Sequence, residues 1–267
     1  MSSFQLNKQF CNQALYAEIR DFWFQDIPEK ATTAPPAVIK KWFGHFETEE
    51  EKDQFDQICH SKFCAALESF GPSEYKLPPA SSWEAEQAHA EEIADPFLAD
   101  CTATFSSDEE YEPNFLSIIL LLDQLSRNIF RQDQAQIYNH YDRIARALLY
   151  SILKLTPRPD LHPSFRFSPV HRFWLYMPLM HSEHIEDQEK CQELMQSFRE
   201  EMLGRDDQPG LDYVEMAIKG AKTHARDIRE FGRFPHRNEH LGRATTREEQ
   251  AFMDGGGNAM APKKATN

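Results

Sequence analysis

The stretch SIILLLDQLSRNIFR, residues 117–131, places five consecutive apolar residues directly before an aspartate. Because this run is so apolar, we expect its helix to enter the core. Asp123, Arg127 and Arg131 repeat every four residues, so they share one helix face. A buried carboxylate among two guanidiniums is costly unless it is paired or ligand-bound. The alternative is an ion pair on a solvated helix edge. Gln124 and Asn128 are also four residues apart, so their amide side chains form an adjacent stripe on the helix.

Helical signals continue on both sides of this stretch. Glycine is scarce, at 10 residues, and no segment alternates with period two. Ser168-Pro169, Gly204 and Gly232 supply start and stop signals. Short connections between consecutive helices indicate antiparallel pairs. The sequence therefore predicts one all-α domain over residues 1–254. The expected helices span 4–24, a short segment after Pro36, 48–70, 113–130, 134–155, 168–184, 187–203, 210–231 and 246–253.

Two segments do not fit this helical pattern. Residues 72–112 hold four prolines and several acidic residues, and Pro113 follows directly. They predict a loop-rich insertion with a short helix near 83–93. Residues 255–267 predict a disordered tail.

The bulk composition limits the possible partners and compartment. A formal net charge of −14 disfavours nucleic acid and anionic membrane surfaces as partners, although such acidity also serves plain solubility. The five cysteines form no CxxC pair, which indicates free thiols in a reducing compartment. With no signal peptide and no long apolar run, we expect a cytoplasmic protein. The oligomeric state and any cofactor are not determined by these features.

A second polar segment, WLYMPLMHSEH at residues 174–184, follows an apolar helix that contains Pro178. This proline removes one backbone hydrogen bond, so we expect a kink or break there. His181, Ser182 and Glu183 come within the next turn, where they could be aimed into a cleft. We expect His181 as an acid or base, with Glu183 orienting it. A hydrogen-bonded core histidine is the alternative.

The third polar segment is FGRFPHRN, residues 231–238. Gly232 ends the preceding helix, and the residue before proline leaves the α region, so a loop follows. From Lys222 to Arg243, six Lys/Arg stand against three Asp/Glu, with three His. A basic loop in an acidic protein could bind an anion; otherwise its arginines hold the C-terminal segment onto acidic helices. Four side chains of this loop are candidates: Arg233, His236, Arg237 and Asn238.

The residues support three functional hypotheses, with the question of catalysis left open. In the first, a pocket binds a small anionic metabolite, with His181 or His236 in acid/base chemistry. In the second, the helices form a peptide-binding scaffold, although no internal repeat supports it. In the third, the polar residues form a purely structural buried network.

No nucleotide-binding, P-loop, zinc-protease or serine-hydrolase motif is present. No spacing demands a metal, although a metal variant could draw ligands from Asp123, His181, Glu183, His224 and His236.

Taken together, the three polar segments closely resemble the DUF924 family of mainly bacterial proteins. The resemblance rests on LLLDQLSRNIFR (120–131), LYMPLMHSEHIEDQE (175–189) and FGRFPHRNEHLGRATTREEQAF (231–252). FWF at 22–24 and KWFG at 41–44 fit its N-terminal part. The resemblance implies a TPR-like right-handed helical superhelix and supplies no established activity. It places recurrent polar positions at Asp123, Gln124, Arg127, Asn128, Arg131, His181, Ser182, Glu183, Arg233, His236, Arg237 and Asn238.

The chain departs from that family pattern at two places. Residues 72–112 look longer than the usual connection, and Gln132 stands where a glycine is common. An insertion of this kind could reshape a cleft, so a ligand inferred from relatives need not transfer to this chain.

Overall fold

The computed structural model describes residues 4–79, 82–103 and 112–257, and every regular element within those ranges is a helix. The predicted all-α class is confirmed, whereas the TPR-like superhelix remains a prediction. The α-helices are α1 Gln13–Phe24, α2 Pro36–Trp42, α3 Glu49–Glu68, α4 Trp83–Ala103, α5 Glu112–Ile119, α6 Ser126–Ile129, α7 Gln134–Gln136, α8 Asp142–Ile152, α9 Pro169–Met180, α10 Ile185–Leu203, α11 Gln208–Phe231 and α12 Arg247–Asp254. Two π-helical segments, η1 Leu120–Leu125 and η2 Ile137–Tyr141, and two 3₁₀ turns, η3 Pro159–Leu161 and η4 Pro235–Arg237, complete the set.

The helix formed by α5, η1 and α6 lies at the centre of the molecule. From Phe115 to Leu122 its side chains are at most 2% exposed. Such a helix is apolar all round because it has neighbours on every side. Its neighbours are α1, α3, α4, α8 and α9. Each fully buried large apolar side chain contributes about 1.5–3 kcal/mol, so this segment anchors the fold, as its sequence predicts.

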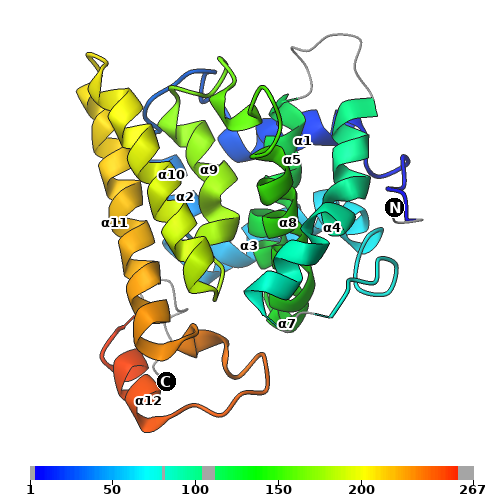
Figure 1. The fold of residues 1–267 in the computed structure, drawn as a ribbon, viewed down its shortest axis with the longest axis vertical. Helices are drawn as coiled ribbons and strands as arrows, with labels where there is room; N and C mark the ends of the chain where they lie inside the picture. The colour runs from blue at the N-terminus through cyan, green and yellow to red at the C-terminus, as the bar shows by residue number, and fades with distance from the viewer. Residues whose placement is uncertain (1–3, 80–81, 104–111, 258–267) are drawn as a thin grey trace.

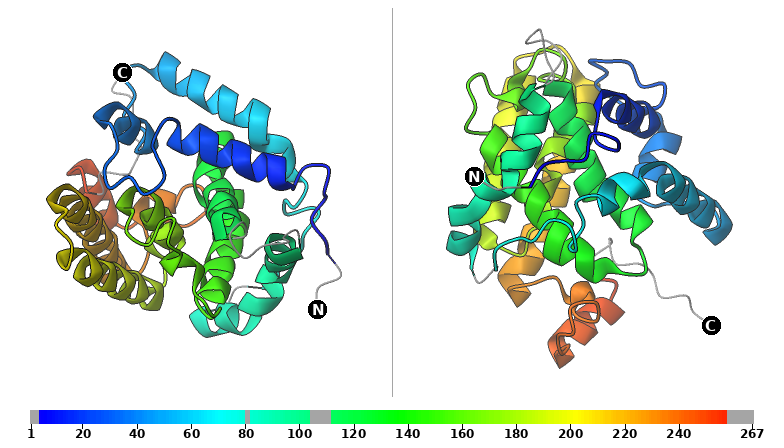
Figure 2. Two further views of the ribbon diagram at one scale, coloured as in Figure 1. Left: turned by 90° about the horizontal axis from the view of Figure 1, so that it is seen from above. Right: turned by 90° about the vertical axis from the view of Figure 1, so that its right-hand side faces the viewer.

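The other helices cover this centre in layers. α9, α10 and α11 lie side by side on one flank, and α4 packs against α8 on the other (Figure 1). α1 and α3 run alongside each other across the central helices (Figure 2). Phe22 of α1 joins them, with ring centroids 5.5 Å from Phe55 and 5.3 Å from Phe63. α12 and the loop after α11 form one end of the molecule (Figure 1).

Several expected helix boundaries are corrected by the structure. The first helix begins at Gln13 rather than residue 4, because the Asn12 side chain caps it by accepting from the Leu15 N–H at 3.1 Å. The helices expected at 113–130 and 134–155 are each interrupted by a π-helical segment. The helix expected to reach residue 184 ends at Met180, and it runs through Pro178 without a break, since the His181 N–H still donates to the Met177 carbonyl at 2.9 Å.

The segment expected to be loop-rich holds a long helix. α4 runs for 21 residues, ten beyond the short helix expected near 83–93, and carries Pro96 inside it. Phe97 and Cys101 are fully buried, and α4 packs along α8. An interior proline costs about 3 kcal/mol, and this burial offsets it. Most of the tail expected to be disordered, from residue 258 onward, lies outside the described residues.

All five cysteines are buried free thiols, as expected from their spacing. Within the described part of the chain, no helix is both long and apolar enough to cross a membrane.

Candidate functional site

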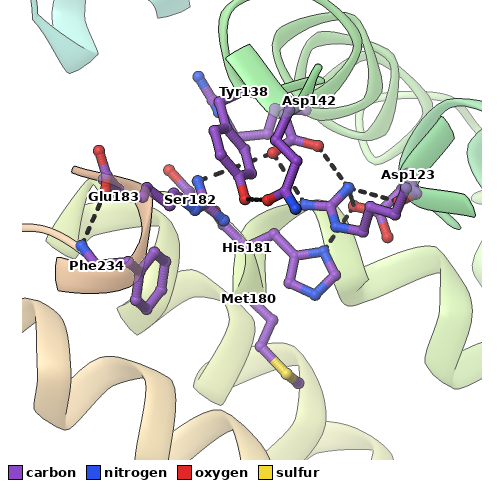
Figure 3. Close-up of polar contacts among 12 residues, drawn as sticks. Asp123, Tyr138, Asp142, Met180, His181, Ser182, Glu183 and Phe234 are labelled. Atoms are coloured by element: carbon purple, nitrogen blue, oxygen red, sulfur yellow. Dashed lines mark hydrogen bonds and ion pairs between the residues drawn. The ribbon is translucent and has the colours of Figure 1, made fainter. Parts of the chain in front are cut away.

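The centre of the candidate site is the contact between His181 and Asp123. Nδ1 of His181 lies 2.8 Å from Oδ1 of Asp123, a carboxylate with no solvent exposure. Figure 3 shows the imidazole ring of His181 pointing toward Asp123. A carboxylate only accepts, so Nδ1 carries the proton and Nε2 of the neutral ring is left as an acceptor.

The end of α9 aims His181 at this carboxylate. Because α9 ends at Met180, His181 occupies the C-cap. Gln188 of α10, which is fully buried, holds the turn because its amide nitrogen, with two N–H donors, lies within hydrogen-bond distance of three carbonyl oxygens. These belong to Met180 (2.7 Å), Ser182 (2.7 Å) and Leu179 (3.3 Å). The orientation of the imidazole is therefore set by the end of α9 together with the hydrogen bonds that Gln188 donates to the turn.

The π-helical segment η1 places Asp123. Segments of this kind insert one extra residue per turn and are frequent at functional sites. Gln124 donates to the second oxygen of Asp123, and Arg127 Nη1 lies 3.7 Å from the first. Burial by itself raises the pKa of the Asp123 carboxyl, but His181 and Arg127 outweigh it, so the net pKa is below the ordinary value. Asp123 is therefore ionised at neutral pH.

A second buried carboxylate, Asp142, lies beside this pair (Figure 3). Arg127 binds it bidentately, at 2.8 and 3.0 Å. Arg237 approaches it at 3.9 Å and donates to the backbone oxygen of His181 at 2.8 Å. The Arg237 guanidinium lies 4.3 Å from the ring centroid of Tyr138 and 4.7 Å from that of Phe234. Two carboxylates and two guanidiniums thus balance in charge around His181.

Three histidines gather at this point. The rings of His181 and His224 are 6.1 Å apart, and Phe234 contacts both His224 and His236. Burial lowers the pKa of His224 to about 4 and that of His236 to about 3, helped by nearby positive groups. Both rings are therefore neutral at pH 7.

An apolar pocket of about 190 Å³ adjoins the cluster. It lies between α9 and α11 and reaches solvent beside Met216, which is 48% exposed. Met180 and His224 form its end nearest His181. Its wall consists of Phe43, Phe173, Met177, Met180, Tyr213, Met216, Ala217, Gly220 and His224.

Some residues expected at the site lie elsewhere. Asn128 and Arg131 bind Asp56 of α3, with the Asn128 Nδ2 and the Arg131 Nη2 each 2.9 Å from one of its oxygens. Arg233 and Asn238 bind Glu249 of α12 instead, at 2.6 and 3.1 Å. These four side chains hold helices and the C-terminal segment together, which is the structural alternative that the sequence left open.

The expected role of Glu183 is corrected, since Asp123 rather than Glu183 contacts His181. Glu183 accepts from the Phe234 N–H at 2.8 Å (Figure 3). It also accepts from Arg243 at 2.7 and 2.9 Å. It therefore fastens the loop after α11. Ser182 is buried and accepts from the His184 N–H at 3.1 Å, at the start of α10. Neither residue lines the pocket.

Sequence reasoning missed Asp142, Tyr138 and Gln188. The first two lie in a stretch that has the pattern of an ordinary amphipathic helix, although their spacing of four was a visible signal. Gln188 lies on α10 among several surface-type amides and carries no signal of its own. Among the described residues, no group of three or more His, Cys, Asp or Glu has an arrangement that would hold a metal ion.

The chain is similar to known proteins over most of its length. The family model for DUF924, described as bacterial protein of unknown function, matches residues 19–257. The chain belongs to the DUF924 family. A solved structure of a protein of unknown function from Agrobacterium tumefaciens has 26% sequence identity and a TM-score of 0.53, covering 91% of this chain and 98% of its own. A search of curated proteins gives no match. Membership in DUF924 thus supports the fold and leaves the activity to be argued from the site.

Proposed function

We propose that this DUF924 protein binds a small molecule beside His181 and that His181 transfers a proton from it or to it. The observation that carries the proposal is the contact of His181 Nδ1 with the fully buried Asp123 carboxylate. A carboxylate in this position holds one tautomer and stabilises the imidazolium that forms when Nε2 takes a proton. His181 is then the general base, and Asp123 is its positioning residue.

The adjoining pocket supports a small-molecule substrate over a macromolecular one. It lies between two helices, and its far end adjoins the histidine cluster through Met180 and His224. Apolar pockets with few convergent polar groups and perturbed histidines are the usual form of small-molecule sites. His224 and His236 remain neutral, so they would act as hydrogen-bonding walls around the reacting group rather than as charges.

The anionic ligand expected from the sequence does not enter this proposal. Arg127 is bound to Asp142, Arg233 to Glu249 and Arg243 to Glu183. The faces of Arg237 are covered by two aromatic rings. These guanidiniums are already paired or stacked, and an anion would have to displace a buried carboxylate.

The same pairing supports a second candidate, in which the network only fixes helix register. Truncation of His181 distinguishes the two candidates. If the network is structural, His181→Ala lowers the melting temperature and there is no turnover to lose. If His181 is a base, turnover disappears while ligand binding and the fold persist.

The test begins with a thermal-shift screen of a neutral and charged metabolite library against the wild-type protein. Compounds that raise the melting temperature are then incubated with the wild type, His181→Ala and Asp123→Asn, and consumption is followed by mass spectrometry. His60→Ala, an exposed histidine on α3, is the matched control. We expect consumption by the wild type and His60→Ala, and a loss of at least about a hundredfold in His181→Ala. Equal consumption by His181→Ala would reject the proposal.

A further inference from the structure

Tyr213, whose side chain lines the pocket, carries a hydroxyl without a function in the fold. The hydroxyl of Tyr213 is buried, the residue being 6% exposed, and it has no hydrogen-bond partner among the residues that the structure describes. Leaving a buried hydroxyl unsatisfied costs about 1–3 kcal/mol. Native structures seldom retain such a group without a reason, and a bound ligand is one such reason.

The pocket is a seam between two helices that small side chains keep open. Tyr213, Ala217, Gly220 and His224 follow one another along α11 at spacings of four, three and four. Along α9, Phe173, Met177 and Met180 have the matching spacing. Residues at these intervals normally interlock. Here a Cβ added at Gly220 would meet no atom of the described residues within 4 Å, so the seam is open at this point.

The seam is long and narrow. Phe173 and Tyr213 lie together at one end, with ring centroids 6.3 Å apart, and Met180 and His224 lie at the other. Eleven residues of helix separate Tyr213 from His224, or about 16 Å at 1.5 Å per residue. A volume of about 190 Å³ spread over that length suits an extended chain better than a ring system. Its three methionines can adapt to such a chain.

The wall also excludes charge. None of the nine lining side chains is charged at neutral pH, because burial lowers the pKa of His224 to about 4. The Nδ1 of His224 lies 2.9 Å from the Gly220 carbonyl, so it donates and Nε2 is left as an acceptor. A charged group would be desolvated here with no counterion.

We propose that the seam between α9 and α11 binds a neutral, medium-chain aliphatic molecule that carries an oxygen at the end next to Tyr213. Its other end reaches His224 and therefore lies beside His181. One part of this inference rests on the proposed function, namely that such a molecule is the class of substrate on which His181 acts. Binding in the seam can be measured whether or not His181 performs chemistry.

The probes are 1-octanol and 1,8-octanediol, with octanoate and octylammonium as charged counterparts, measured by calorimetric titration of the whole chain. We expect the diol to bind more tightly than 1-octanol, and both charged probes to bind at least about tenfold more weakly. Tyr213→Phe should remove the advantage of the diol, a loss of roughly threefold to tenfold for one hydrogen bond. This isosteric change also leaves the pocket volume intact, so misfolding is not expected.

Gly220→Leu fills the seam and should weaken the diol at least about tenfold. Gly204→Leu, a matched change at the end of α10 away from the pocket, should leave the affinity unchanged. The inference is overturned if the wild type binds neither neutral probe, if octanoate binds as tightly as 1-octanol, or if Gly220→Leu binds the diol normally. His181→Ala separates the two proposals: retained diol binding with loss of metabolite turnover upholds both, whereas retained diol binding with unchanged turnover rejects only the proposed function. Turnover by the wild type without diol binding overturns only the seam.

Discussion

The imidazole of His181 and the carboxylate of Asp123 meet at 2.8 Å, although 58 residues separate them in the chain. His181 lies at the C-cap of α9, and Asp123 lies in a π-helical turn. Both the helix end and the π-helical turn depart from regular helix geometry at the same point in space. Local departures of this kind concentrate at functional sites, so this pair is the first place where substitutions should separate catalysis from stability.

Asp123→Asn should destabilise the protein by about 1.5–3 kcal/mol, the value of a hydrogen bond to a charged group. The amide keeps the shape of the side chain but removes the charge that faces His181 and Arg127. Urea unfolding at pH 7 measures the change. Asp133→Asn, at an exposed position, should stay within about 0.5 kcal/mol. Equal free energies of unfolding for the two variants would show that the charge of the buried carboxylate does not stabilise the fold.

Gln188→Leu should cost about 2–3 kcal/mol, because it leaves buried carbonyls of the His181 turn without a donor. The turn should then lose its fixed position, which can be followed through the ring resonances of His181 in NMR spectra. Gln196→Leu is the matched control, since Gln196 is exposed on the same helix. Unchanged His181 ring resonances in Gln188→Leu would mean that the turn after α9 keeps its position without Gln188.

Glu183→Gln should loosen the loop between α11 and α12. The carboxylate accepts from the Phe234 N–H and twice from Arg243, and the charge is lost in the variant. We expect faster cleavage of this loop in limited proteolysis and a loss of about 1.5–3 kcal/mol. Glu18→Gln removes half of an exposed pair with Lys62 and should have little effect. Unchanged cleavage in Glu183→Gln would contradict the fastening role.

Stability should fall as the pH drops from about 6.5 toward 4. Burial lowers the folded-state pKa of His224 to about 4 and that of His236 to about 3, so the unfolded chain binds more protons over that range. Each such histidine contributes stability that is complete above its unfolded pKa and declines by about 1.4 kcal/mol per pH unit below it. Thermal melting at pH 7, 6 and 5 measures the slope. His224→Gln should flatten it, and a slope equal to that of the wild type would place the proton uptake elsewhere.

The candidate site was only partly predictable from the chain. Asp123, Arg127, His181 and Arg237 were identified as candidates and do converge. Glu183 was expected to orient His181, but beyond the end of α9 His181 contacts Asp123 whereas Glu183 contacts Phe234 and Arg243. Asn128 and Arg131 follow Asp123 in the same helical stretch, yet they bind Asp56. About one to two turns beyond Asp123, the neighbouring element is α3 instead of the end of α9.

The all-α class and the buried central helix are determined by the sequence alone, since they depend on local propensity and apolar periodicity. The two π-helical turns, the partner of His181 and the open seam beside Gly220 depend on tertiary packing. Each arises from contacts between residues tens of positions apart, and the free energy that selects them is burial and hydrogen bonding among whole helices. No short stretch of the chain encodes that energy, so only the folded arrangement determined where the polar segments meet and what space they enclose.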